Sequence, residues 1–348
     1  MKKSQMRGYL YEIFISHLLQ KNGFSKCHQN ALGILNGGIV SVDGEIQGRG
    51  TNHQIDFVGI YSRNIPFVFP IRLLAECKFW SKKVDKSFIR QYVGVYKDIS
   101  ENYISSQRED TNRFLDVPII FSASDFDKEA VNLAWAQGIN LVSHSRLPIL
   151  QNMLNLINTI VESLYTHLDF NQVKLFVETF LSNEEVAMTE TYIDFVNRFI
   201  THINSQPNLN IDNFTDQIEQ MRESRINTFL FATNNNGSLI NLVSEDEFPD
   251  ELFQTNTADC MIYFDRDNTS ENERVFYITL NQDNQQRKFY FQANEALLSK
   301  DFPQLSLRQR MDIKLDYFSE LSIIKEINNI TRIVKLRVDL ETIMNNVN

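Results

Sequence analysis

The sequence contains few cysteines, and they are not spaced as metal ligands. Cys27, Cys77 and Cys260 are the only three in 348 residues, and none lies in a CxxC spacing. This excludes a disulfide framework and a cysteine zinc site. The six histidines form no HxxxH pair. With only 12 Gly and 7 Pro, the composition also excludes a fibrous or disordered chain.

Long hydrophobic runs are also missing. The best candidate, Ile65–Ile71, is interrupted by Pro66 and is far shorter than the roughly 18 residues of a spanning helix. Lys2 and Lys3 begin the chain, but Glu12 lies where a signal peptide needs its apolar region. We therefore expect no membrane association, no secretion and, given the unpaired cysteines, a cytoplasmic location.

The charge is unevenly divided along the chain. The net charge is −10, but residues 1–160 contain 18 basic and 14 acidic residues, whereas residues 161–348 contain 16 basic and 30 acidic ones. An acidic total thus hides a mildly basic N-terminal half that suits a nucleic-acid partner. The acidic half is a poor second DNA clamp, because binding to phosphates depends on positive charge.

Hydrophobic periodicity predicts an α/β domain over residues 1–150. Apolar residues at helical spacing predict helices, and short β-branched runs predict strands. The predicted helices are 4–21, 85–101 and 125–137, and the predicted strands are 54–61, 71–79, 117–122 and 139–143, with a hairpin around Asp43 and Gly44. This order predicts a mixed central sheet flanked by helices.

Two further parts are predicted after residue 150. Residues 151–225 read as a helical connector, with helical stretches around 150–166, 173–181 and 192–203. Residues 226–348 read as an acidic α+β domain that regulates the protein, binds a protein partner or forms a homo-oligomer. Its predicted strands are 228–232, 238–243, 261–264, 275–280 and 288–291, and the pattern of 321–344 is ambiguous.

The most informative residues are Asp56, Glu76 and Lys78. Asp56 lies in one predicted strand, and Glu76 and Lys78 lie two residues apart in the next. Side chains alternate along a strand, so Glu76 and Lys78 share one face while Cys77 takes the other, where we expect inert burial. Two carboxylates on neighbouring strands form an oxygen site suited to Mg²⁺. With an adjacent cation, this is the chemistry of phosphodiester hydrolysis.

The pattern Asp…Glu-x-Lys often occurs by chance, but the sequence around it here makes a functional site more plausible. The charged residues Glu76 and Lys78 interrupt an otherwise apolar strand, where unpaired charges are costly. A basic segment with Lys82, Lys83, Lys86 and Arg90 follows directly. This segment is read either as a DNA-binding surface or as a solvated helix face.

The first 150 or so residues resemble the PD-(D/E)xK restriction-endonuclease-like superfamily, in particular its Mrr-like branch. The matching residues are Gly48-Arg49-Gly50 at the end of a Gly-rich strand, Gln54-Ile55-Asp56 and Ala75-Glu76-Cys77-Lys78. A later run from Pro118 to Val142 fits as well. Ile55 replaces the family's proline, and Asn52-His53 replaces its usual glycine-rich run.

The resemblance implies a site in which Asp56, Glu76, the backbone carbonyl of Cys77 and Glu12 bind Mg²⁺, with Mn²⁺ able to substitute. It implies that Lys78 orients the attacking water and that Gln91, on the following helix, is the polar residue often found there. Glu12 is equally readable as a solvated charge, and Gln91 as a capping or bridging residue. His53 is read as incidental.

Double-stranded DNA is the expected substrate, with Arg49, Lys82, Lys83, Lys86 and Arg90 as its contacts. No GxxxxGK[ST] motif occurs, so no NTPase is expected. The expected function is a Mg²⁺-dependent DNA endonuclease in restriction or anti-phage defence. Two alternatives stay open: a Holliday-junction-resolvase-like repair nuclease, and a non-catalytic DNA-binding or scaffold subunit of a defence complex.

Overall fold

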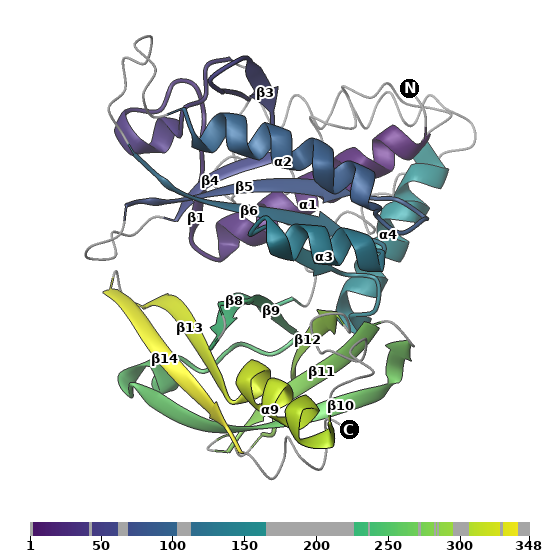
Figure 1. The fold of residues 1–348 in the computed structure, drawn as a ribbon, viewed down its shortest axis with the longest axis vertical. Coiled ribbons are helices and arrows are strands. Elements are labelled where there is room, and N and C mark those ends of the chain that lie inside the picture. Colours follow the sequence, from purple (N-terminus) through teal and green to yellow (C-terminus); the bar gives the residue numbers. More distant parts are fainter. Residues whose placement is uncertain are drawn as a thin grey trace, which may run out of the picture.

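The structure is a computed structural model of the chain. It describes residues 3–41, 44–61, 69–102, 113–164, 226–235, 237–270, 273–281, 283, 285–294, 306–327 and 330–339. Two parts follow one another in sequence, an α/β domain and a β-barrel, and they lie one above the other in Figure 1.

A five-stranded mixed sheet forms the centre of the N-terminal domain, as expected from the sequence. Its strand order is β1-β4-β5-β6-β7. The three strands β5, β6 and β7 are parallel, and β4 pairs antiparallel with both β1 and β5. The bounds are β1 Phe24–Lys26, β4 Phe57–Tyr61, β5 Ile71–Lys78, β6 Leu115–Ser122 and β7 Asn140–Ser143.

Helices cover both faces of this sheet (Figure 1). The side chains of α1 (Lys3–Lys21) and α4 (Pro148–Leu164) share one core with the sheet, and those of α2 (Lys86–Ser100) and α3 (Lys128–Ala136) share another. Asp85 and Asp127 cap the N-termini of α2 and α3 with their carboxylates. The predicted helices are confirmed within a few residues.

The strand predicted over 54–61 is divided in two. β3 (Asn52–Gln54) pairs with β2 (Glu45–Gln47) in a small separate hairpin, and β4 starts only at Phe57. Gly48-Arg49-Gly50, expected to end a strand, instead belongs to the turn between β2 and β3. The bridge between Ile39 and Ile46 supports the hairpin expected around Gly44, although residues 42–43 lie outside the described part.

The C-terminal part is a closed barrel of seven strands. Their order around the barrel is β10-β11-β12-β9-β8-β13-β14, and it closes through a parallel pair between β10 and β14. The strands are β8 Thr228–Asn234, β9 Leu239–Ser244, β10 Thr257–Ser270, β11 Glu273–Leu280, β12 Phe289–Asn294, β13 Glu320–Ile327 and β14 Ile330–Val338. Helix α9 (Leu307–Phe318) precedes β13, so the expected α+β domain is, in its described residues, mainly a barrel.

An aromatic cluster joins the barrel to the α/β domain. Phe229 and Phe231 of β8 lie 6.3 and 6.4 Å from the ring of Phe121 on β6. His144, just after β7, is buried against Phe229, and its Nδ1 lies 2.8 Å from the hydroxyl oxygen of Tyr11 on α1. Burial lowers the pKa of His144 to about 3, so it is neutral at physiological pH and belongs to the apolar contact.

The helical connector is described only at its start. Helix α4 covers the first predicted stretch, whereas the predictions over 173–181 and 192–203 lie outside the described residues. No helix among the described residues is both long and apolar enough to cross a membrane.

Candidate active site

The break between β3 and β4 places Asp56 beside β5. The ladder between β4 and β5 ends at the pair Phe57 and Ala75. The next free amide on that edge of β5, the N–H of Cys77, donates to Oδ2 of Asp56 at 2.7 Å. A side-chain carboxylate thus takes the place of a ladder bond, which is why Asp56 is held at the strand end although it is not within the strand.

Lys78 joins the two carboxylates. Its Nζ lies 2.7 Å from Oε2 of Glu76 and 3.4 Å from Oδ2 of Asp56. The three side chains are only 17% (Lys78), 13% (Glu76) and 17% (Asp56) exposed. Asp56, Glu76 and Lys78, which we call the triad, therefore lie together as predicted from the sequence. Charge-assisted hydrogen bonds in a mostly buried site link them.

The alternation predicted for β5 holds. Cys77 is buried in the core shared with α1, as are Ala75 and Leu73, whereas Leu74 belongs to the core shared with α2. Glu76 and Lys78 are half-buried on the α2 side. Burial and the negative charge of Asp56 raise the pKa of the Cys77 thiol well above its usual value, so it is an inert packing group.

The pKa values of the site follow from burial and crowding of like charges. Burial, and then the charge of Asp56, raises the pKa of Glu76 to about 7, and Lys78 offsets only part of this rise. Burial alone would lower the pKa of Lys78, but the charges of Glu76 and Asp56 outweigh it and raise that pKa above the ordinary value. Lys78 therefore stays protonated at neutral pH.

These residues fit a divalent cation. Two neighbouring carboxylates with one lysine leave an excess negative charge when Glu76 is ionised, and hard cations take such oxygen ligands. Alternate residues of a strand direct their backbone groups to opposite edges; the Lys78 carbonyl accepts from Ala123 on the β6 side, so the carbonyl of Cys77 faces Asp56. No group of three or more candidate ligands forms among the described residues.

Glu12 lies half-buried on α1, on the other side of the sheet from Glu76. Its charge acts on the thiol of Cys77 and contributes to raising that pKa, which places Glu12 within electrostatic range of the strand end. The structure thus brings Glu12 toward the site, while direct participation in metal binding stays a prediction.

Helix α2 packs aromatic side chains against Lys78 and β5. The ring of Phe88 lies 4.8 Å from Nζ of Lys78, and Trp80 packs edge-on against Phe88 with ring centroids 5.5 Å apart. One turn on, the hydroxyl of Tyr92 donates to the carbonyl of Leu74 at 2.5 Å. These contacts fix the α2–β5 distance and limit the exposure of Lys78.

Gln91 is exposed on α2, three residues after Phe88 and therefore on the same side of the helix. No hydrogen bond from Gln91 to the triad is found among the described contacts. Of the basic residues that follow β5, Lys86 pairs with Glu129 on α3, and Lys83 lies 3.9 Å from Asp125. Arg90 is exposed.

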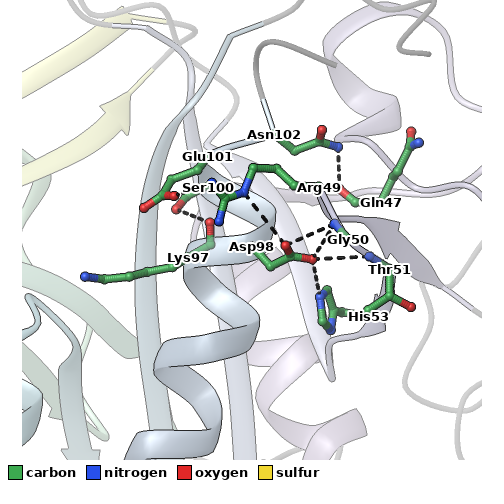
Figure 2. Close-up of polar contacts among 10 residues, drawn as sticks. All are labelled: Gln47, Arg49, Gly50, Thr51, His53, Lys97, Asp98, Ser100, Glu101 and Asn102. Atoms are coloured by element: carbon green, nitrogen blue, oxygen red, sulfur yellow. Dashed lines mark hydrogen bonds and ion pairs between the residues drawn. The ribbon is translucent and has the colours of Figure 1, made fainter. Parts of the chain in front are cut away.

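Arg49 lies beside Asp98 and Glu101 at the C-terminal end of α2 (Figure 2). Its Nη1 is 3.0 Å from Oε2 of Glu101, and its Nε is 3.9 Å from Oδ1 of Asp98, so the end of α2 opposite to Lys86 neutralises it. The structure therefore does not group Arg49 with Lys82, Lys83, Lys86 and Arg90. The reason is tertiary: the β2–β3 turn folds onto the last turn of α2.

Asp98 holds the β2–β3 turn in place, and with it the segment that leads to Asp56. Its carboxylate accepts from the backbone N–H of Gly50 at 3.1 Å and of Thr51 at 3.4 Å, and it lies 2.8 Å from Nε2 of His53 (Figure 2). Burial opposes ionisation, but these hydrogen bonds outweigh it and lower the pKa of Asp98. His53, read as incidental from the sequence, has a structural role three residues before Asp56.

Three residues that contribute to the candidate site or its surroundings were not predicted from the sequence. Asp98 and Phe88 lie on a predicted helix, but only the contacts of the folded chain reveal what they touch. Arg146 follows β7 and is exposed beside the loop that follows β5. No local motif identifies it, although its position just after a predicted strand was a usable signal, because ligands bind beyond the carboxyl ends of parallel strands.

Comparisons with known proteins do not identify a family for this chain. The chain matches no family model and no curated protein. A solved structure described as Protein of Unknown Function AF1548 is similar over 57% of this chain and 99% of its own, with 15% identity and a TM-score of 0.30. A likeness this low does not bear on fold or function.

Proposed function

We propose that the protein is a metal-dependent nuclease that hydrolyses phosphodiester bonds, with DNA as its substrate. The observation that carries the proposal is the half-buried triad: Lys78 lies 2.7 Å from Glu76 and 3.4 Å from Asp56 at the end of β5. The resemblance to the PD-(D/E)xK superfamily in the same residues supports it. Restriction or anti-phage defence is the setting we propose, with the barrel as the regulatory or partner-binding part.

In this proposal Asp56 and Glu76, with the carbonyl of Cys77, hold a Mg²⁺ ion. The ion would supply Lewis-acid polarisation of the phosphate and lower the pKa of a bound water. Lys78 stays protonated beside the two carboxylates, so it cannot act as the general base. Its ammonium group donates hydrogen bonds, orients the attacking water and stabilises charge that develops on the phosphoryl oxygens.

The metal dependence provides a direct test on supercoiled plasmid. We expect Mg²⁺ and Mn²⁺ to support nicking, and Ca²⁺ to support binding with little turnover, because Ca²⁺ accepts the same oxygens with looser geometry. Excess EDTA should abolish nicking. A Lys78→Ala variant purified in parallel separates the activity of this chain from that of a contaminant. Robust cleavage in EDTA, or by the variant, would contradict the proposal.

A second prediction concerns pH. Glu76 has a raised pKa of about 7, and a metal ligand must be deprotonated, so Mg²⁺ competes with a proton for this carboxylate. Above pH 7 Glu76 is ionised and Mg²⁺ binds at full strength; below it, each unit of pH weakens apparent Mg²⁺ affinity by about tenfold. Mg²⁺ titrations followed by Tm at pH 6 and pH 8 measure this difference.

The matched control for the pH experiment is Glu76→Gln, which keeps the shape of the side chain but has no proton to lose. It should bind Mg²⁺ weakly, with little difference between the two pH values. Equal Mg²⁺ affinity of the unaltered protein at pH 6 and pH 8 would show that Glu76 is not a ligand.

A further inference from the structure

A cleft lies beyond the carboxyl ends of β5, β6 and β7, and its lining includes Phe79, the residue after Lys78, but none of Asp56, Glu76 and Lys78. It has a volume of about 720 Å³ and is lined by the loops that follow β5, β6 and β7 and by the helices α1 and α4. We call it the strand-end cleft and define it by Arg7, Trp80, Lys82, Lys83, Asp125 and Arg146. The crevice outside the carboxyl ends of parallel strands is a common ligand position in α/β folds.

The strand-end cleft is basic although the protein as a whole is acidic. Its lining contains four cationic side chains and one carboxylate, that of Asp125. Asp125 is buried and lies near Lys83 at 3.9 Å. Arg7 is paired with Glu162 at 2.7 Å. Lys82 and Arg146 are exposed, and the described contacts include no ion pair for either, so both are available to a polyanion.

The walls of the cleft come from opposite sides of the sheet. Trp80, Lys82 and Lys83 belong to the loop leading to α2, whereas the facing wall is formed by α1 and by amide side chains of α4 (Gln151, Asn155 and Asn158). A volume of about 720 Å³ is of the size that holds a drug-sized molecule. This volume is sufficient for a short stretch of one nucleic-acid strand.

An aromatic pair connects the cleft to the triad. Trp80 lies in the cleft lining and packs on Phe88, whose ring lies 4.8 Å from Nζ of Lys78. Nζ of Lys82 lies 5.7 Å from the centre of the Trp80 ring. Basic side chains interleaved with an aromatic ring are the usual means of holding a single strand.

We propose that the strand-end cleft binds a single-stranded extension of the substrate, so that the preferred substrate is a duplex with a single-stranded end or branch. This rests on the proposed nuclease function, which places a phosphodiester at Lys78. Lys82 and Arg146 contact phosphates of the extension, and the amides of α4 add neutral hydrogen-bond donors. Arg146 is thereby added to the proposed substrate-binding residues.

Binding of labelled DNA to the full-length protein in EDTA tests this without relying on cleavage. The probes are a blunt duplex and the same duplex with an oligothymidine extension. We expect the extension to tighten binding by roughly tenfold. The double variant Lys82→Ala, Arg146→Ala should lose this gain, and its salt dependence on the extended probe should fall by about 1.4 in log–log slope. Lys97→Ala, an exposed lysine at the far end of α2, is the matched control.

Equal binding of blunt and extended probes by the unaltered protein would overturn the inference, and so would an equal loss on both probes in the double variant. The proposed function fails differently. If the extension tightens binding through Lys82 and Arg146 but no metal supports cleavage, the cleft assignment stands and the nuclease proposal falls. If blunt duplex is cleaved at the same rate as extended duplex, the nuclease proposal stands and the role proposed for the cleft is contradicted.

Discussion

Replacing Asp56 with asparagine is expected to lower the rate of Mg²⁺-dependent cleavage by about 10³-fold or more. Asparagine keeps the shape of the side chain, and its amide oxygen can still accept the N–H of Cys77, which Asp56 binds at 2.7 Å. The strand end should therefore keep its position while the site loses one of its two anionic ligands. Single-turnover cleavage of a labelled duplex measures the loss.

The matched control is Asp312→Asn, which removes an exposed carboxylate from α9 in the barrel. It should cleave at the unaltered rate. Urea denaturation of both variants checks that each is folded. If Asp56→Asn cleaves as fast as the control while both remain folded, Asp56 is not a metal ligand and the active centre lies elsewhere.

Arg72→Met is expected to destabilise the fold by about 3–5 kcal/mol, because it leaves a buried carboxylate without its partner. Arg72 on β5 donates to both oxygens of Asp116 on β6 at 2.6 and 2.8 Å, and to the carbonyl of Gly37 at 2.6 Å. The two side chains are only 4% (Arg72) and 5% (Asp116) exposed. The free energy of unfolding in urea measures the effect.

Two variants sharpen the stability test. Arg90→Met removes an exposed arginine from α2 and should change the free energy of unfolding by less than about 0.5 kcal/mol. The double variant Arg72→Met, Asp116→Leu should recover most of the loss, since replacing both members of a buried ion pair by apolar residues is often neutral. A single variant as stable as the unaltered protein would show that Asp116 finds another partner or reaches water.

Local patterns were sufficient where one segment determines its own structure. The apolar repeat of residues 4–21 became α1, and the two-residue period of β5 correctly separated Glu76 and Lys78 from Cys77. The capping box formed by Ser306 and Gln309 is a local signal of the same kind for α9. Helical and strand periodicities are properties of a single segment, so sequence alone reveals them.

The remaining features depend on partners distant in the chain. Asp56 lies at the end of β5 because its carboxylate replaces a ladder bond to Cys77, and Arg49 is separated from the other basic residues because Asp98 holds its turn on α2.

Closure of the barrel requires the parallel pairing of β10 with β14, more than 60 residues apart in sequence. Hydrogen bonds and ion pairs between remote segments leave no period in either segment. The sequence by itself therefore determined the elements and the faces of β5, whereas the tertiary structure decided which charges meet at the site and which are neutralised away from it.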